Sequence, residues 1–103
     1  MCYLFVQHTS ASLAISESYD PTAREDMEMF LEKLVPEGQA WYTHTLEGAD
    51  DSSSHLRALL TPVCLTIPID EGRLSLGTWQ GLYLIEHRAQ PQRRRVLLRC
   101  LGR

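Results

Sequence analysis

The chain has 103 residues, of which 44% are hydrophobic, and this supplies enough apolar material for the core of one small domain. Thirteen acidic and ten basic residues give a net charge of -3 at pH 7, which argues against nucleic-acid binding through bulk positive charge. Three cysteines without CxxC spacing indicate reduced thiols. No signal-peptide pattern opens the chain, and no apolar run approaches the roughly 20 residues of a membrane-spanning helix. We therefore expect a cytoplasmic protein that binds neither nucleic acid nor a membrane.

The first predicted element is a strand in residues 3–15, YLFVQHTSASLAI, where aromatic and β-branched residues precede small hydroxyl residues. In an extended chain, Leu4, Val6, His8 and Ser10 share one face. His8 is therefore either a core histidine with a partner or a residue that reaches into a pocket.

The second predicted element is a helix that begins at Pro21. Asp20 is a suitable N-cap, and proline is tolerated at the first helical position because its missing N–H would have no partner there. Apolar residues then recur at helical spacing until Pro36 and Gly38 end the segment. The charged residues between them indicate a solvated outer face.

A short strand and a short helix are predicted next. Residues 40–48, AWYTHTLEG, are rich in Trp, Tyr and Thr and end at a glycine, a composition typical of a strand. A helix is then capped by Asp51 or by one of the three serines that follow it. This helix must stop near Thr61, because the next residue is a proline that disfavours helical backbone before it. His55 therefore lies in the first turn of the helix.

Three strand patterns complete the chain, in residues 62–70, 73–88 and 93–101. Short turns separate them, which favours an antiparallel meander. Together with one long helix and one short helix, these strands predict an α+β fold.

The segment YTHTLEGADDSSSH contains the strongest candidate metal ligands, His44 and His55. Imidazole and carboxylate groups are ligands for zinc-like ions, and the loop between the histidines can bring both rings to one point. Glu47, Asp50 and Asp51 lie in this loop and offer a further ligand or a partner that orients an imidazole. The alternative is structural: the two aspartates make turn and cap hydrogen bonds, and the histidines are half-exposed polar residues.

The segment LGTWQGLYLIEHR is the second candidate site. Glycine inside a strand marks a bulge or a close approach to the backbone, so Gly77 and Gly81 indicate a ligand, a neighbouring chain or a tight corner of the sheet. Strict alternation places four polar residues on one face: Thr78, Gln80, Glu86 and Arg88. Such groups can bind an anion, unless Glu86 and Arg88 are simply exposed at the strand end.

The segment HTSAS is the third candidate site. His8 beside Ser10 suggests a serine nucleophile, but the chain has no GxSxG elbow, and neighbours in sequence do not make a catalytic triad. A pocket wall that hydrogen-bonds a phosphate or a metal-bound water suits these residues better.

These segments occur in an order that resembles the YjbQ-like family of small proteins. The resemblance is carried by HTSASLAISE, by DP with Arg24 and Asp26, by YTHTLEGADDSSSH, by IPIDEGRLSLGTWQG and by EHR. It covers nearly all of the chain, and GTWQG and HxxEGxDD are its most specific motifs. Family members carry an additional N-terminal segment, so the resemblance implies a single domain, residues 1–103, that lacks this segment.

The resemblance implies an antiparallel, barrel-like sheet capped by a helix, and assembly as a homotrimer. It also implies a metal or anion site at His44, His55 and His8. For some members it further implies a secondary thiamine-phosphate synthase activity, which joins an aminopyrimidine diphosphate to a thiazole phosphate and releases pyrophosphate. Phosphorylated substrates need cations, and Arg73, Arg88 and a divalent ion, zinc or magnesium, are the candidates.

Three functions follow from the candidate residues. The first is a transferase in which small phosphorylated substrates are oriented by His8, Ser10, Thr78 and Gln80. The second is a trimeric module that holds a metal and a small anion without turnover. The third is a metal-dependent hydrolase with Glu47 or Glu86 as general base.

Overall fold

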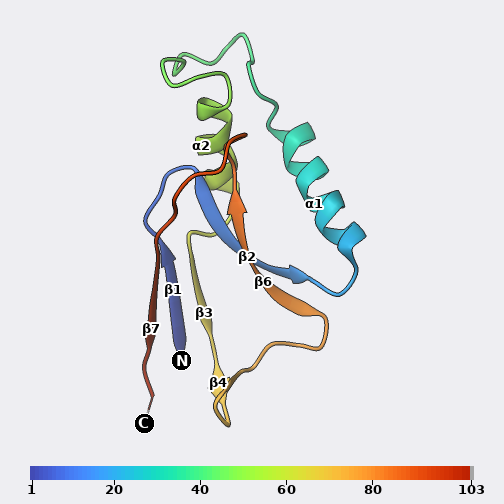
Figure 1. Cartoon of the computed structure of the whole chain (residues 1–103), viewed down its shortest axis with the longest axis vertical. Helices are drawn as coiled ribbons and strands as arrows, with labels where there is room; N and C mark the ends of the chain where they lie inside the picture. Colours follow the sequence, from blue (N-terminus) through green and yellow to red (C-terminus); the bar gives the residue numbers. More distant parts are fainter. Residues whose placement is uncertain (103) are drawn as a thin grey trace.

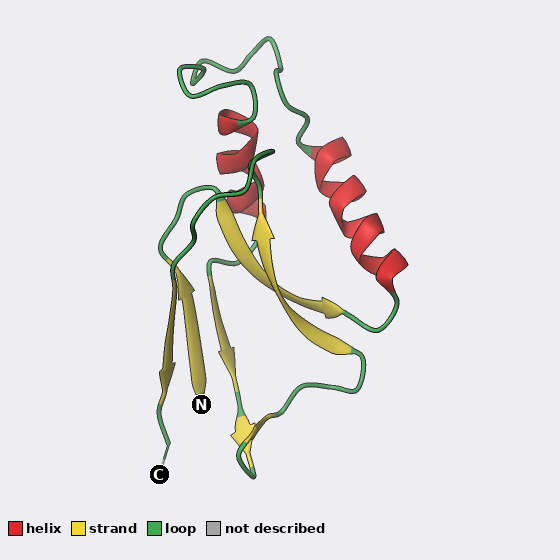
Figure 2. Cartoon of the chain, in the orientation of Figure 1, coloured by secondary structure: helices red, strands yellow, loops and turns green. Residues whose placement is uncertain are grey.

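The computed structural model describes residues 1–102, which form two helices and seven strands (Figures 1 and 2). In chain order they are β1 (Cys2–Val6), β2 (Ala11–Glu17), α1 (Pro21–Leu34), α2 (Asp51–Leu60), β3 (Cys64–Ile67), β4 (Ile69–Asp70), β5 (Arg73–Leu74), β6 (Gln80–Glu86) and β7 (Val96–Cys100). The α+β prediction is therefore confirmed. Neither helix in this part of the chain has the length and apolar character needed to cross a membrane.

The strands form three antiparallel sheets, with the orders β3-β1-β7, β2-β6 and β4-β5. None of them closes on itself, so the barrel-like sheet is wrong. The meander is also wrong, because β3, β6 and β7 do not pair with one another. The physical reason is the bend at residues 7–10, where the predicted first strand divides. β2 leaves the sheet of β1 there and pairs with β6, while β3 and β7 take the two edges of β1.

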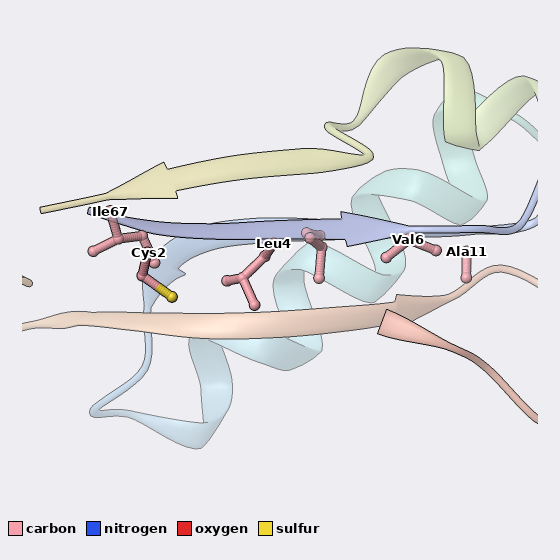
Figure 3. Packing of buried hydrophobic residues seen from close by; sticks show 6 residues of the cluster. Cys2, Leu4, Val6, Ala11 and Ile67 are labelled. Atoms are coloured by element: carbon pink, nitrogen blue, oxygen red, sulfur yellow. The ribbon is translucent and has the colours of Figure 1, made fainter. Parts of the chain in front are cut away.

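The core lies on one face of β1. Cys2, Leu4 and Val6 are buried, whereas the residues between them are exposed, because successive side chains of a strand point to opposite faces. Ala11, Leu13 and Ile67 complete this cluster. Figure 3 shows Cys2, Leu4 and Val6 in one row along β1, with Ala11 and Ile67 at the two ends of the row.

Helix α1 begins as predicted, because the Oδ1 atom of Asp20 accepts a hydrogen bond from the backbone N–H of Thr22 at 2.9 Å. None of its residues is fully buried. The buried Arg57 of α2 anchors its C-terminal end by donating from Nε and Nη2 to the carbonyl oxygen of Val35, at 3.1 and 2.9 Å. A groove of about 800 Å³ remains between α1 and β6.

The strand predicted in residues 40–48 is wrong, and this segment is an exposed loop. A strand needs a neighbour for its backbone hydrogen bonds, and within residues 1–102 no strand pairs with this segment. Its one buried side chain is Tyr42, whose hydroxyl donates to the carbonyl oxygen of Pro36 at 2.6 Å. The second helix is confirmed, but its N-cap is Asp50 and it begins at Asp51, earlier than the predicted cap at Asp51 or a serine. His55 is therefore its fifth residue and lies in the second turn.

Gly81 marks a close approach, as its place in a strand indicated. A Cβ atom at this position would lie 2.3 Å from both Cβ and Oγ of Ser18. The approaching group therefore belongs to the same chain, and the close contact itself implies neither a ligand nor a neighbouring subunit at Gly81.

Candidate metal centre

Three side chains converge at the N-terminal end of α2: His44, Asp51 and His55. One potential ligand atom from each lies within 4.8 Å of the others. The Oδ2 atom of Asp51 lies 2.7 Å from Nε2 of His44 and 3.2 Å from Nε2 of His55. Asp51 and His55 are four residues apart on one helix, which places them on the same face, and the loop before α2 supplies His44.

The orientation of the His55 ring is set by a backbone contact, since its Nδ1 atom lies 2.9 Å from the carbonyl oxygen of Thr9. A carbonyl oxygen only accepts hydrogen bonds, so Nδ1 carries the hydrogen. In a neutral ring, Nε2 is then a bare acceptor, and it faces a second acceptor, Oδ2 of Asp51. Two acceptors at 3.2 Å are stabilised by a cation or a proton between them, and a bare Nε2 is the form that binds a metal.

Arg88 fixes the carboxylates behind this cluster. It donates from Nη1 to Oδ1 of Asp51 and from Nε to Oδ2 of Asp50, each at 2.9 Å. Its Nη2 atom also donates to the carbonyl oxygen of Glu47 at 3.0 Å. One oxygen of Asp51 is thus held by Arg88 while the other faces the histidines. Hydrogen bonds from Arg88 and from the backbone N–H of Ala89 lower the pKa of Asp50 to about 2.

The cluster is open on one side. The Asp51 side chain is only 5% exposed, whereas those of His55 and His44 are 33% and 57% exposed. Zinc is commonly held by three protein ligands when a fourth position stays open for water or substrate, and by four ligands when its role is structural. The arrangement therefore matches the open kind of site.

The two predicted catalytic acids lie outside this cluster. Glu47 contributes its carbonyl oxygen to Arg88, and its side chain is exposed. Glu86 forms an ion pair with Arg94. Burial would raise the pKa of Glu86, but hydrogen bonds from Arg94 and from the backbone N–H of Arg88 outweigh this effect and lower it. A carboxylate held ionised by an arginine is a weak general base.

The predicted substrate-binding residues are divided between two regions. His8 and Ser10 lie in the bend after β1, beside Thr9 and therefore next to the cluster. Arg73, Thr78 and Gln80 are exposed on β5, on the segment after it and at the start of β6. Figure 1 places the β4–β5 hairpin at the opposite end of the molecule from α2, and β6 starts at its end farther from α2, so these three residues are not brought to the cluster.

A further polar cluster, centred on His87, was missed. Its Nε2 atom lies 2.7 Å from Oγ of Ser12, which in turn lies 2.5 Å from Oγ1 of Thr61. Burial and the nearby charge of Arg57 lower the pKa of His87 to about 4, so the ring is neutral at pH 7. Ser12 and His87 are both buried, so this cluster is part of the packed interior. The signal in the sequence was the alternation of His87 with the half-buried Tyr83 and Ile85.

These features define a small α+β protein with an open cluster of two histidines and an aspartate at the start of a helix. The model of the family described as UPF0047 protein YjbQ-like matches residues 1–103, and the chain belongs to this family. A relative from Synechocystis, UPF0047 protein sll1880, is 48% identical over 99% of this chain and 69% of its own length. UPF0047 protein YjbQ from Salmonella typhimurium is 45% identical over 99% of this chain and 73% of its own length.

Solved structures share the fold. The conserved hypothetical protein TT1486 from Thermus thermophilus superimposes with a TM-score of 0.88 at 41% identity, covering 97% of this chain and 76% of that one. The hypothetical protein APE1520 from Aeropyrum pernix gives 0.86 at 32% identity, covering 99% and 73%. The relatives are thus longer than this chain, and the matched part of this chain spans the positions of all three cluster residues.

Proposed function

We propose that the protein binds one divalent metal ion through Nε2 of His44, a carboxylate oxygen of Asp51 and Nε2 of His55. The observation that carries the proposal is the bare Nε2 of His55, held toward Oδ2 of Asp51 by the contact between Nδ1 and Thr9. Two imidazoles and one carboxylate suit zinc better than magnesium, which prefers oxygen ligands. Arg88 acts as a positioning residue, because every hydrogen bond that its guanidinium group makes within residues 1–102 holds Asp50, Asp51 or the carbonyl oxygen of Glu47.

Calorimetric titration of zinc into protein stripped with a chelator tests this proposal. Wild type should bind about one zinc ion per chain, and His44→Ala and His55→Ala should bind it at least tenfold more weakly. Glu47→Gln is the matched control, because it changes a polar residue of the same loop whose side chain lies outside the cluster. Equal zinc affinity in all four proteins would remove the site assignment.

The reaction we propose for this centre is the secondary thiamine-phosphate synthase reaction, in which a thiazole nitrogen displaces pyrophosphate from an aminopyrimidine diphosphate. A metal at an open site supplies positive charge that stabilises a leaving diphosphate. His44, Asp51 and His55 would hold the metal ion near the surface, because the His44 side chain is exposed. The proposal of this reaction rests on the resemblance of the motifs to the YjbQ-like family, which implies the activity for some members.

Formation of thiamine phosphate by zinc-loaded protein tests the reaction separately from the metal. The expected result is product in wild type and Glu47→Gln, and loss of product in His44→Ala. If wild type binds zinc tightly but none of the three proteins forms product, the result would favour a binding module that holds a metal and a small anion.

We also propose that the chain assembles as a homotrimer. The trimer is supported by apolar side chains that are exposed on two strands. Leu82 and Leu84 of β6 are 41% and 50% exposed, and Leu98 of β7 is 55% exposed. Such surface on strands with open edges is stabilised by contact with another chain. Light scattering after size exclusion should give three times the chain mass of 11.8 kDa. A monomeric mass at micromolar concentration would rule the trimer out.

A further inference from the structure

A second, basic pocket lies between the bend that follows β1 and the segment that precedes β7. It has a volume of about 300 Å³, and its walls are Gln7, His8, Arg93, Arg94 and Arg95. Two hydrogen bonds join its halves: the N–H of Gln7 donates to the carbonyl oxygen of Arg95 at 3.3 Å, and the N–H of Arg95 donates to Nε2 of His8 at 2.8 Å. The segments before β7 and after β1 are therefore held together, and the pocket has a fixed frame.

The three arginines of this basic pocket have different roles. Arg94 is 8% exposed, pairs with Glu86 and donates to the carbonyl oxygen of Ser10 at 3.1 Å, so it is a neutralised part of the wall. Arg93 and Arg95 are exposed, and within residues 1–102 neither forms an ion pair. Their two guanidinium groups leave a concentrated positive charge in a protein whose net charge is -3.

His8 adds a hydrogen-bond donor to this charge. Its Nε2 atom accepts from the N–H of Arg95, so in a neutral ring the hydrogen is on Nδ1. No acceptor within residues 1–102 is bonded to Nδ1. The basic pocket thus combines two planar forks of N–H groups with one further N–H, a set of donors that matches the oxygens of a tetrahedral anion.

We propose that the basic pocket binds the phosphate group of a small molecule, with Arg93 and Arg95 as the charged ligands and His8 as a neutral donor. A volume of about 300 Å³ accommodates a phosphate group with attached atoms. The dianionic charge of a phosphate monoester favours it over a carboxylate. Phosphate binding in the basic pocket does not require the metal. The two sites are nonetheless neighbours, because Thr9 follows His8 in the bend and orients His55.

Titration of inorganic phosphate into chelator-treated protein, followed by calorimetry at constant ionic strength, tests the proposal. Saturable binding is expected in wild type, and Arg93→Gln and Arg95→Gln should each weaken it about tenfold. Arg99→Gln is the matched control, because it removes the same charge from an exposed position on β7 outside the basic pocket and should leave affinity within about twofold.

Glycerol phosphate should bind at least as tightly as inorganic phosphate, and succinate more weakly. Circular dichroism of each variant should match wild type, because both arginines are exposed and their side chains form none of the hydrogen bonds described here. Absence of saturation, equal weakening by Arg99→Gln, or tighter binding of succinate would each overturn the proposal. Since no metal is present, these results are independent of zinc binding.

Discussion

His55 and Thr9 lie 46 positions apart in the sequence, yet Nδ1 of the histidine is 2.9 Å from the carbonyl oxygen of the threonine. This contact joins the second turn of α2 to the bend between β1 and β2. It leaves Nε2 of His55 without a hydrogen in the neutral ring and directs it to Asp51. The cluster is therefore organised by the fold of the distant N-terminal strands as well as by its own loop.

The tautomer of His55 is the first prediction. Long-range nitrogen-proton NMR of chelator-treated protein near pH 8 should show a hydrogen on Nδ1 and a bare Nε2, because Thr9 offers only an acceptor. Addition of zinc should then shift the Nε2 resonance and leave Nδ1 protonated. A hydrogen on Nε2 in the metal-free neutral ring would contradict the geometry.

Arg88→Lys is the second prediction. A lysine cannot reproduce the simultaneous hydrogen bonds to Asp50, Asp51 and the carbonyl oxygen of Glu47. Zinc affinity, measured by chelator competition, should fall about tenfold through loss of the fixed Asp51 orientation. Arg73→Lys, on the distant β5, should bind zinc as wild type does. An unchanged zinc affinity in Arg88→Lys would mean that Arg88 stabilises only the loop.

The pH dependence of stability is the third prediction and concerns His87. Its folded-state pKa, about 4, is below its ordinary value of 6.5, so between these pH values the unfolded chain binds more protons. The contribution of the neutral His87 ring to the free energy of unfolding is therefore complete above pH 6.5. It is lost as the pH falls toward 4, which lowers the free energy of unfolding by up to about 3 kcal/mol.

Urea unfolding between pH 4 and pH 8 measures this decrease. Comparison with His87→Gln isolates the contribution of the ring, because glutamine does not titrate in this range. The free energy of unfolding of this variant should change less steeply with pH than that of wild type. Parallel curves for the two proteins would assign the acid sensitivity to other groups.

A disulfide between Cys2 and Cys100 is the fourth prediction. The two residues are register partners on β1 and β7, and burial together with the Cys100 thiol raises the pKa of Cys2. A mild oxidant should join them with loss of two hydrogen atoms, detected by mass spectrometry, and closure of this long loop should stabilise the protein by up to about 4 kcal/mol. Cys64→Ser should still form the bond, because Cys64 lies opposite Phe5, whereas Cys100→Ser should not.

The parts of the fold that local chemistry determines were predictable. Asp20 and Pro21 define the start of α1 through contacts within a few residues, and both positions are confirmed. Strand partners were not predictable in the same way, because alternation identifies the buried face of β1 but not its neighbours. The pairing of β1 with β7 joins the two ends of the described chain, and only the three-dimensional fold reveals it.

In the candidate site, too, local features were predictable from the sequence and long-range contacts were not. The spacing of Asp51 and His55 is a local signal for one helix face, although the catalytic role was assigned to Glu47 and Glu86 instead. The positions of His44 and Thr9 depend on how a loop and a bend pack against α2, which no spacing encodes. Membership of the YjbQ-like family, in contrast, was predictable from motifs and is confirmed.

The most direct test of the metal centre is elemental analysis of protein purified without a chelator and without a metal-affinity column. We predict about one zinc ion per chain in wild type and Glu47→Gln, and a small fraction of that in His44→Ala, Asp51→Asn and His55→Ala. Folded wild-type protein free of transition metal, or equal metal content in all five proteins, would contradict the assignment.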